Sequence, residues 1–358
     1  MIIIIIFLIS QFRYFSTKKF PSSLKIENFI LNMATTFDPS ACELTRPNET
    51  RYVLFPIEHP HLYQLYKQHQ SVIWTADEID YSKDRASFLK LDPPVQRYLT
   101  WVLAFFAASD GVVMENLASK FFSEVQLAEA RSFYATQLYM EQIHSETYSL
   151  LIDTYITDPA EKMRVLGAAN SIDTVGAKVK WAERWMDSDR PFPQRLIAFA
   201  VVEGVFFSGA FCSIFYLKRF DLPGLSFSNE LIARDESLHT EFAVTCYNTY
   251  CKGSVSEHTV TELVREAVEL ETSFIRDALP VTLIGMDADS MTEYIKFVAD
   301  RLMLQLGFAA IYGCQNPFPF MDAIGVRPKS NFFETRVGEY AKPASREIDF
   351  DAAAGSEF

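Results

Sequence analysis

Six residues with metal-binding side chains lie in helix-forming stretches of this 358-residue chain. Two stretches each carry Glu-x-x-His, and because helical residues three apart share a face, both side chains of each pair point the same way. Two other stretches each carry one acid among apolar residues. The six residues are Asp110, Glu141, His144, Glu203, Glu236 and His239. Two lone carboxylates and two Glu-x-x-His pairs on four helices can enclose two metal ions, so we predict a dinuclear metal site.

The two lone acids are the most unusual members of this set. Asp110 lies within LAFFAASDGVVM and Glu203 within IAFAVVEGVFFSGAF, so residues typical of a core almost surround both. A carboxylate buried there alone would cost on the order of several kcal/mol, so it needs a cation, a hydrogen-bonding partner or a shifted pKa. The alternative is a helix that is exposed at that one point.

The charge of the set supports metal binding. Its four carboxylates carry a charge of −4, which two divalent cations would balance. Without cations the converging anions would repel one another and take up protons. Oxygen-rich ligands with one imidazole per metal favour iron or manganese over zinc or copper. The absence of thiolates from the set disfavours an iron–sulfur cluster.

A tyrosine and three apolar residues stand at helical spacing from these ligands. Tyr148 follows His144 by four residues, Phe207 and Phe211 follow Glu203 by four and eight, and Ile232 precedes Glu236 by four. If the helices that carry Glu203 and Glu236 are antiparallel, the three apolar side chains surround the phenol. A dry phenol beside a high-valent metal pair can lose an electron and a proton and persist as a radical. The alternative is that Tyr148 is one of 16 tyrosines, packing a core.

Asp235, directly before a ligand, has two interpretations. It can orient a metal-binding histidine from outside the ligand set, or it can be a surface acid on the opposite face of its helix.

Apolar residues at helical period dominate the chain after residue 60, and strand signals are nearly absent. A helix is expected to start at Asp92 and Pro93. Further helices are expected at 126–153, 159–170, 172–187, 191–219, 226–251, 257–279 and 288–312. The sequence therefore predicts an all-α, ferritin-like helical bundle with the dinuclear carboxylate site in its core. The predicted parts are an N-terminal extension (1–32), a leading segment (33–60), the bundle (61–322) and a flexible tail (323–358).

Composition limits the partners and the compartment. A net charge of −13 without a basic stripe argues against nucleic acid binding. Five cysteines without a C-x-x-C pair argue against a disulfide framework and indicate a reducing, cytoplasmic setting. The apolar run 2–9 is too short to span a bilayer, so no membrane association is predicted. The basic residues at 13–19 are typical of an organelle presequence, whereas Met33 begins a segment typical of a cytosolic start.

Nine separated segments between about residues 50 and 340 resemble the small subunit of class I ribonucleotide reductase, in its eukaryotic-type form. They include RYVLFPIEHP, WTADEID, VLAFFAASDGVVMENL, MEQIHSETYSLLIDTYI, AFAVVEGVFFSGAFCSIF, FSNELIARDESLH and NFFETRVGEY. The resemblance implies that the six residues bind two iron ions, with manganese less expected. It also implies that O2 and this centre generate a stable radical on Tyr148, inside a hydrophobic pocket of Phe207, Phe211 and Ile232.

The resemblance further implies a route and a partner for the radical. The route would run from His144 through Asp235, Trp74 and Tyr340 to a cysteine of a separate large subunit, which reduces ribonucleoside diphosphates to deoxyribonucleoside diphosphates. The large subunit would bind the C-terminal tail, and the small subunit would be a homodimer. Here the chain ends in REIDFDAAAGSEF, whose aromatic and acidic residues are separated by Ala and Gly. This departure bears on how strongly the tail would bind, or on which large subunit it would bind.

Two other functions fit a dinuclear carboxylate site. One is an oxidase, such as a hydroxylase or desaturase, which the Asp at position 110, Trp74 and the tail tyrosine disfavour. The other is iron storage or assembly, which the length of the chain and its tail disfavour. The chain has no P-loop, dinucleotide fingerprint or redox cysteine pair, so the nucleotide chemistry is expected on a partner.

Overall fold

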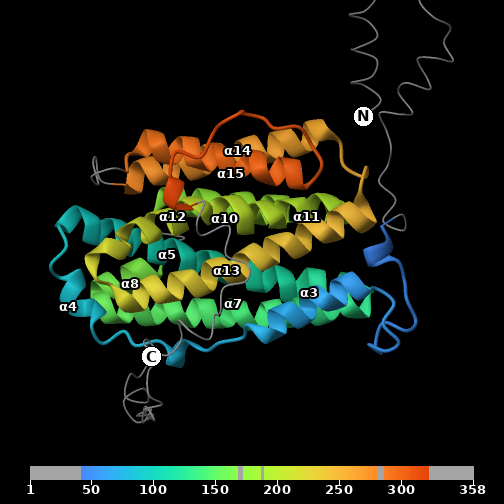
Figure 1. Cartoon of the computed structure of the whole chain (residues 1–358), viewed down its shortest axis with the longest axis horizontal. Helices are drawn as coiled ribbons and strands as arrows, with labels where there is room; N and C mark the ends of the chain where they lie inside the picture. Colours follow the sequence, from blue (N-terminus) through green and yellow to red (C-terminus); the bar gives the residue numbers. More distant parts are fainter. Residues whose placement is uncertain (1–41, 168–171, 187–188, 280–285, 322–358) are drawn as a thin grey trace, which may run out of the picture. The chain divides into compact units, whose positions relative to one another are not determined.

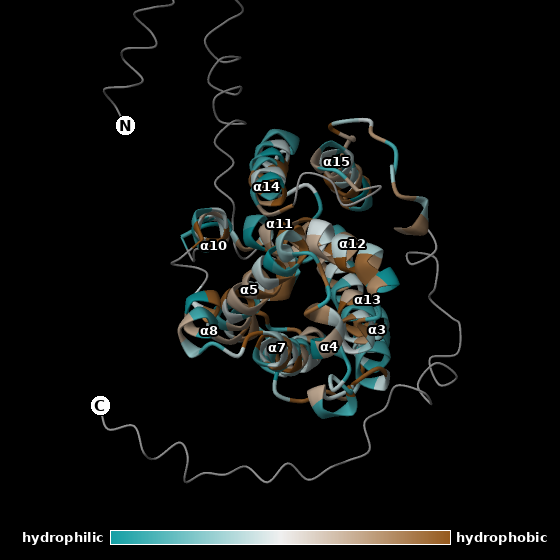
Figure 2. Ribbon diagram, turned by 90° about the vertical axis from the view of Figure 1, so that its left-hand side faces the viewer, coloured by the Kyte–Doolittle hydropathy of each residue, from teal (hydrophilic) through white to brown (hydrophobic). Residues whose placement is uncertain are grey.

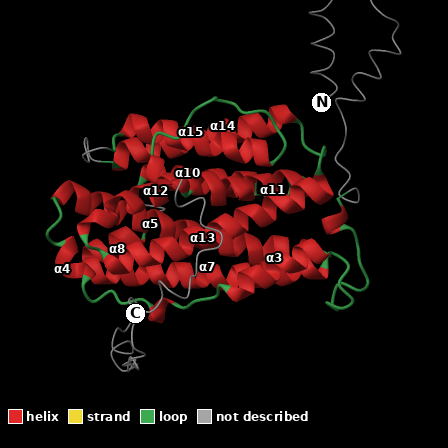
Figure 3. Cartoon of the chain, in the orientation of Figure 1, coloured by secondary structure: helices red, strands yellow, loops and turns green. Residues whose placement is uncertain are grey.

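Helices make up the regular structure of this protein, as the apolar periodicity predicts (Figure 3). The computed structural model describes residues 42–167, 172–186, 189–279 and 286–321, and no β-strand occurs among them. All of these residues belong to one unit, Pro39–Phe358. The predicted N-terminal extension and the predicted tail lie outside the described residues.

The helices longer than one turn are α3 (Pro60–Ser71), α4 (Asp84–Phe88), α5 (Pro93–Asn116), α7 (Ala128–Tyr155), α8 (Pro159–Leu166), α10 (Asp173–Trp185), α11 (Phe192–Val201), α12 (Ser208–Leu217), α13 (Pro223–Cys246), α14 (Glu257–Ala278) and α15 (Ala288–Gln305). Three π-helical turns extend or interrupt them: Leu117–Phe121, Val202–Phe206 and Tyr247–Cys251. The short elements are α6 (Phe122–Glu124) and the 3-10 turns Glu43–Thr45, Ala76–Glu78 and Lys218–Phe220.

Several predicted boundaries were wrong, each for a local reason. The helix expected at 288–312 ends at Gln305, because Gly307 takes a left-handed conformation with φ 85°. The Asp300 carboxylate then accepts the backbone N–H groups of residues 311 to 314. The helix expected at 226 starts at Pro223, and 191–219 is interrupted by the π-helical turn Val202–Phe206. Helix α3 was not predicted.

Helices from distant parts of the sequence pack against one another in the bundle. Helix α7 packs against α3 and α5, and α13 packs against α11 and α12. Helices α14 and α15 lie side by side at one edge, next to α11 and α12 (Figures 1 and 2). The hydrophobic residues gather between the helices (Figure 2), as expected when apolar stripes drive the packing.

Two segments, Pro93–Glu124 and Phe192–Phe220, are long and apolar enough to cross a membrane by length and composition alone. Burial in the protein core explains why the second segment is so apolar, because 94% of its most apolar window is inside the protein. The corresponding share of the first is 56%. Since the two segments also carry Asp110 and Glu203, their apolar residues form the wall around buried acids.

A buried carboxylate fixes the start of α13. Asp84 accepts the backbone N–H groups of Gly224 and Leu225, each at 2.8 Å, and the Tyr155 hydroxyl at 2.9 Å. These N–H groups belong to the first turn of α13, where no intrahelical acceptor exists. Gly224 is needed there, because a Cβ would lie 2.9 Å from the Tyr81 ring. This contact matters for the site, because α13 carries Asp235, Glu236 and His239.

We expect Asp84→Ala to lower the free energy of unfolding by at least about 2 kcal/mol, since it leaves buried donors without an acceptor. Tyr155→Phe removes only a hydroxyl and should cost about 1 kcal/mol. Urea denaturation followed by circular dichroism measures both. Equal stability of Asp84→Ala and the unmodified chain would contradict this account of α13.

Candidate metal centre

Four helical segments bring the six predicted ligands together. Asp110 lies on α5, Glu141 and His144 on α7, Glu203 in the π-helical turn Val202–Phe206, and Glu236 and His239 on α13. All six are buried, with at most 3% of any residue exposed. They form two groups of potential metal ligands. Within each group, the donor atoms lie within 4.8 Å of one another. The groups are Asp110, Glu141 and His144, and Glu141, Glu203, Glu236 and His239.

Two glutamates connect the halves of the cluster. Glu141 lies 3.4 Å from Nδ1 of His144 through Oε2 and 3.1 Å from Nδ1 of His239 through Oε1. Glu236 lies 3.0 Å from each of the same two nitrogens, through Oε1 and Oε2 respectively. Each carboxylate therefore reaches both histidines, so either could be shared by two metal ions. Glu141 belongs to both groups of potential ligands, and Asp110, Glu203 and Glu236 each belong to one.

Unsatisfied acceptors show that this donor set fits a cation. Asp110 Oδ2, Glu141 Oε2 and Glu203 Oε2 are buried and have no hydrogen-bond partner. Burial, and then the charge of Glu141, raises the pKa of Asp110 well above its usual value. Burial, and then the charge of Glu236, does the same to the pKa of Glu203. Divalent cations would replace these protons and supply the missing partners.

The π-helical turn that carries Glu203 is held by a buried ion pair. Lys178 on α10 donates from Nζ to the Phe206 carbonyl oxygen at 2.9 Å and is also paired with Glu271 of α14. Burial lowers the pKa of Lys178 to about 8 despite that pairing. A π-helical turn inserts one residue into the helix and turns the side chains that follow it. The regular spacing assumed from the sequence could not reveal this turn.

Gln137, one turn before Glu141 on α7, was also missed from the sequence. It is buried, and its Nε2 atom donates to Glu141 Oε1 at 3.3 Å and to Glu203 Oε1 at 3.2 Å. It therefore links two of the carboxylates from outside the ligand set. Its position four residues before a ligand was the available signal, but an amide at that spacing is common on helix surfaces.

Asp235 faces the site, and of its two predicted interpretations the buried one fits. Its Oδ2 atom lies 3.3 Å from Nε2 of His144 and accepts the Trp74 indole N–H at 2.7 Å. The Trp74 ring also stacks over His144, with centroids 6.0 Å apart. Arg234 donates to Asp235 Oδ1 at 2.8 and 3.0 Å. Trp74, Asp235 and His144 thus form a continuous, buried, hydrogen-bonded chain. Tyr340 lies outside the described residues.

His69 occupies the corresponding place beside the other histidine and was not predicted. Its Nε2 atom lies 3.2 Å from Nε2 of His239, and neither residue is exposed. Burial, and then the neighbouring His239, lowers the pKa of His69 to about 3, so its ring is neutral near pH 7. His69 lies on α3, the helix that sequence patterning did not reveal.

Tyr148 lies in an aromatic setting near the cluster. It is 3% exposed, and burial, then the charge of Asp110, raises its pKa well above 10. Its ring stacks on Phe106, with centroids 4.6 Å apart and planes 3° from parallel. Phe207 and Phe211 lie against the same Phe106 ring, at 5.5 and 4.9 Å.

Phe106 was missed in the sequence, although it precedes Asp110 by one helical turn. Of the predicted pocket, Phe207 and Phe211 contact the Phe106 ring, and their place around the phenol itself stays a prediction. Ile232 is fully buried, and its place beside Tyr148 stays a prediction.

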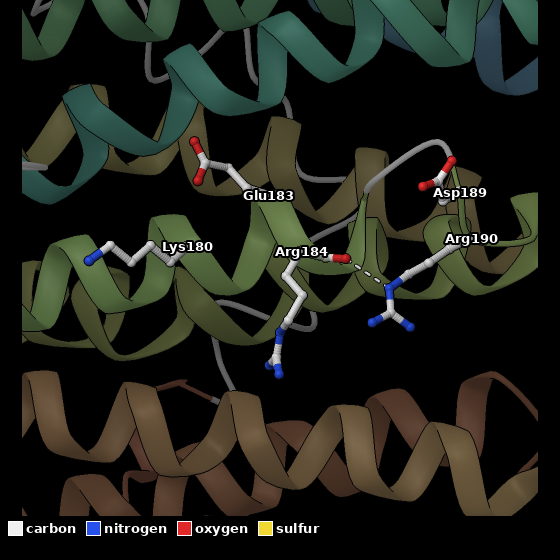
Figure 4. Close-up of a pocket in the computed structure, with 5 residues that line it drawn as sticks. All are labelled: Lys180, Glu183, Arg184, Asp189 and Arg190. Atoms are coloured by element: carbon white, nitrogen blue, oxygen red, sulfur yellow. Dashed lines mark hydrogen bonds between the residues drawn. The ribbon is translucent and has the colours of Figure 1, made fainter.

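The surface hollow drawn in Figure 4 is unrelated to this cluster. Charged side chains line it: Lys180, Glu183, Arg184, Asp189 and Arg190. Arg190 donates to the Arg184 backbone carbonyl at 2.8 Å, and Arg184 pairs with Glu266. None of the six candidate ligands lines the hollow, so the chemistry is expected in the bundle interior.

Comparisons with known proteins agree with this geometry. Residues 51–317 match the family model described as ribonucleotide reductase, small chain. The chain is 54% identical over 300 residues to the ribonucleoside-diphosphate reductase small chain of Trypanosoma brucei brucei, covering 84% of this chain and 89% of that protein. It is 50% identical over 301 residues to human ribonucleoside-diphosphate reductase subunit M2, covering 84% and 77%.

Solved structures give the same fold. The ribonucleotide reductase Rnr4 homodimer from Saccharomyces cerevisiae superposes with a TM-score of 0.74 at 33% identity, covering 87% of this chain and 98% of that one. The dimanganese(II)-NrdF of Streptococcus sanguinis has a TM-score of 0.65 at 17% identity, covering 75% and 96%. The second likeness supports the fold alone.

Replacement of Lys178 tests how the π-helical turn is held. We expect Lys178→Met to lower the free energy of unfolding by about 3–5 kcal/mol, because it leaves Glu271 buried without its cation. The double variant Lys178→Met with Glu271→Leu should recover most of this loss. Urea denaturation of the unmodified chain, the two single variants Lys178→Met and Glu271→Leu, and the double variant measures the effect. If the double variant loses as much free energy of unfolding as the two single variants lose together, the pairing of Lys178 with Glu271 is not what matters.

Proposed function

The chain belongs to the ribonucleotide reductase small-chain family, and we propose that its six buried ligands hold two iron ions that generate a radical on Tyr148. The family supplies the radical subunit of ribonucleoside-diphosphate reductase. That enzyme reduces ribonucleoside diphosphates to deoxyribonucleoside diphosphates for DNA synthesis, on a separate large subunit. The observation that carries the proposal for this chain is the pair of glutamates that each reach both histidines.

We propose Glu141 and Glu236 as shared ligands, with Asp110 and His144 on one metal and Glu203 and His239 on the other. When bound, the two ions supply, with O2, the oxidising power that removes one electron and one proton from the Tyr148 phenol. The oxygen-rich donor set suits both iron and manganese. Metal analysis of protein purified without added metal, combined with electron paramagnetic resonance, separates the two.

The surroundings of Tyr148 support its role as the radical site. Low polarity and nearby carboxylates keep the phenol protonated, so the hydroxyl proton has to leave together with the electron. The Phe106 ring covers one face of the phenol, and Phe207 and Phe211 pack behind it. These rings would exclude water and reductants from the radical.

The chain of Trp74, Asp235 and His144 is the proposed route for the radical. Each neighbouring pair is within hydrogen-bond distance. Asp235 Oδ2 contacts both the Trp74 indole N–H and Nε2 of His144, so it can hold a proton from either ring. Beyond Trp74 we propose Tyr340 as the next carrier and the C-terminal tail (323–358) as the segment that binds the large subunit. We also propose a homodimer, as in the solved Rnr4 relative.

An oxidase acting on a small or lipid substrate is the alternative. Turnover of such a substrate by the isolated chain would favour it. An oxidase of this kind would need no hydrogen-bonded route from the ligand cluster to an indole, so it leaves the contacts of Trp74 unexplained. Iron storage would require a large cage, so a dimer in size-exclusion chromatography would exclude it.

We expect Tyr148→Phe to bind metal as the unmodified chain does and to lack the tyrosyl radical signal. The change removes one hydroxyl that is not among the ligands, so the fold and the site should persist. Electron paramagnetic resonance after addition of iron(II) and O2 measures the radical, and metal analysis of the same sample is the control. A radical that survives in Tyr148→Phe would refute the assignment to this residue.

We expect Trp74→Phe to form the radical but to reduce nucleotide turnover about 10–100-fold, because the N–H that binds Asp235 is lost. Turnover is measured with the large subunit added, and the radical is quantified in the same sample. Trp181→Phe is the matched control, since Trp181 is also a buried tryptophan but lies on α10 outside the route. A similar loss of turnover in both variants would count against the route.

A further inference from the structure

The two candidate ligand histidines have the same orientation but different neighbours. Each points Nδ1 at the carboxylates of Glu141 and Glu236 and directs Nε2 away from the cluster. Behind His144, Nε2 faces the Asp235 carboxylate at 3.3 Å. Behind His239, Nε2 faces Nε2 of His69 at 3.2 Å. The second histidine is therefore backed by an imidazole rather than by an acid.

The distance between these two nitrogens determines where the protons are. At 3.2 Å the contact is an N–H···N hydrogen bond, so one nitrogen carries a proton and the other accepts it. A metal on Nδ1 of His239 uses the lone pair of that atom, which leaves the ring proton on Nε2. Nε2 of His69 must then be the acceptor, and the proton of His69 lies on its own Nδ1.

The surroundings of His69 hold it in this arrangement. Its ring packs against Phe133 with centroids 4.9 Å apart, and it meets the His239 ring edge-on at 4.8 Å and 66°. The residue has no exposed surface. Its Nδ1 atom has no hydrogen-bond partner among the residues that the structure describes. Such a buried, unsatisfied N–H costs about 1–3 kcal/mol. The hydrogen bond to His239 is therefore the one polar contact among the described residues that the His69 side chain makes.

We infer that His69 is a positioning residue for His239, which fixes the tautomer and ring orientation in which Nδ1 can bind metal. This inference rests on the metal site proposed above and adds a residue outside the six ligands. Partners of this kind raise metal affinity by orienting the ligand. Because the partner of His239 is neutral, it orients the ring without adding charge, whereas Asp235 does both for His144.

The test is a titration of metal-free protein with manganese(II), which stays divalent and gives a resonance signal when free in solution. We expect the unmodified chain to bind two ions. His69→Leu should bind one of them about 10–100-fold more weakly, because His239 loses its acceptor. His69→Gln should restore most of the affinity, since the glutamine oxygen can accept the same hydrogen bond.

Phe133→Leu is the matched control, because it alters packing on both the His69 and the His239 rings and leaves the acceptor in place. It should bind two ions like the unmodified chain, and thermal unfolding of all variants reports on the fold. Unchanged affinity in His69→Leu, or equal weakening in His69→Leu and His69→Gln, would overturn the inference. An unmodified chain that binds fewer than two ions would instead overturn the metal site itself, and this inference with it.

Discussion

The repulsion among four buried carboxylates is the constraint to which the rest of the bundle responds. Asp110, Glu141, Glu203 and Glu236 come from four helical segments that would separate if their charges were unopposed. Contacts outside the cluster hold these segments in place. Gln137 links two of the acids, Lys178 holds the π-helical turn, and Asp84 fixes the start of α13. The site is thus prepared by polar contacts that do not themselves touch the proposed metals.

The same constraint explains why the polar contacts are buried rather than solvent-exposed. In a low-polarity interior a hydrogen bond or ion pair acts on its partner more strongly than it would at the surface. Lys178 illustrates the cost, since burial lowers its pKa to about 8 even beside Glu271. A side chain held under such conditions is sensitive to small shifts. A loosened π-helical turn would move Glu203, although Lys178 is not a ligand.

The sequence was sufficient to predict which six side chains gather in the core, and insufficient for what supports them. Glu-x-x-His works as a signal because helical spacing alone puts both side chains on one face, and Asp110 and Glu203 stand out against apolar neighbours. Gln137, Phe106 and His69 carry no such signal, since each looks like an ordinary residue until distant helices meet. Helix α3 has a polar sequence (PHLYQLYKQHQS), so apolar periodicity did not reveal it or His69. The π-helical turn follows from packing, which spacing rules do not include.

The placement of Tyr148 relative to the hydrogen-bonded chain bears on how a radical could be both stable and usable. Tyr148 follows His144 by one turn on α7, yet within the described part of the chain its hydroxyl has no hydrogen bond to Trp74, Asp235 or His144. A phenol hydrogen-bonded directly to that chain would exchange its electron and proton with Trp74 continuously. Separated from it, and covered by Phe106, a radical on the phenol would be protected from that exchange. Under the proposed function, the aromatic cover would account for storage of the radical, and the histidine backed by Asp235 would account for its release. His239 is backed by the neutral His69, whose far nitrogen has no hydrogen-bond partner among the described residues, so on that side the hydrogen-bonded chain ends at His69.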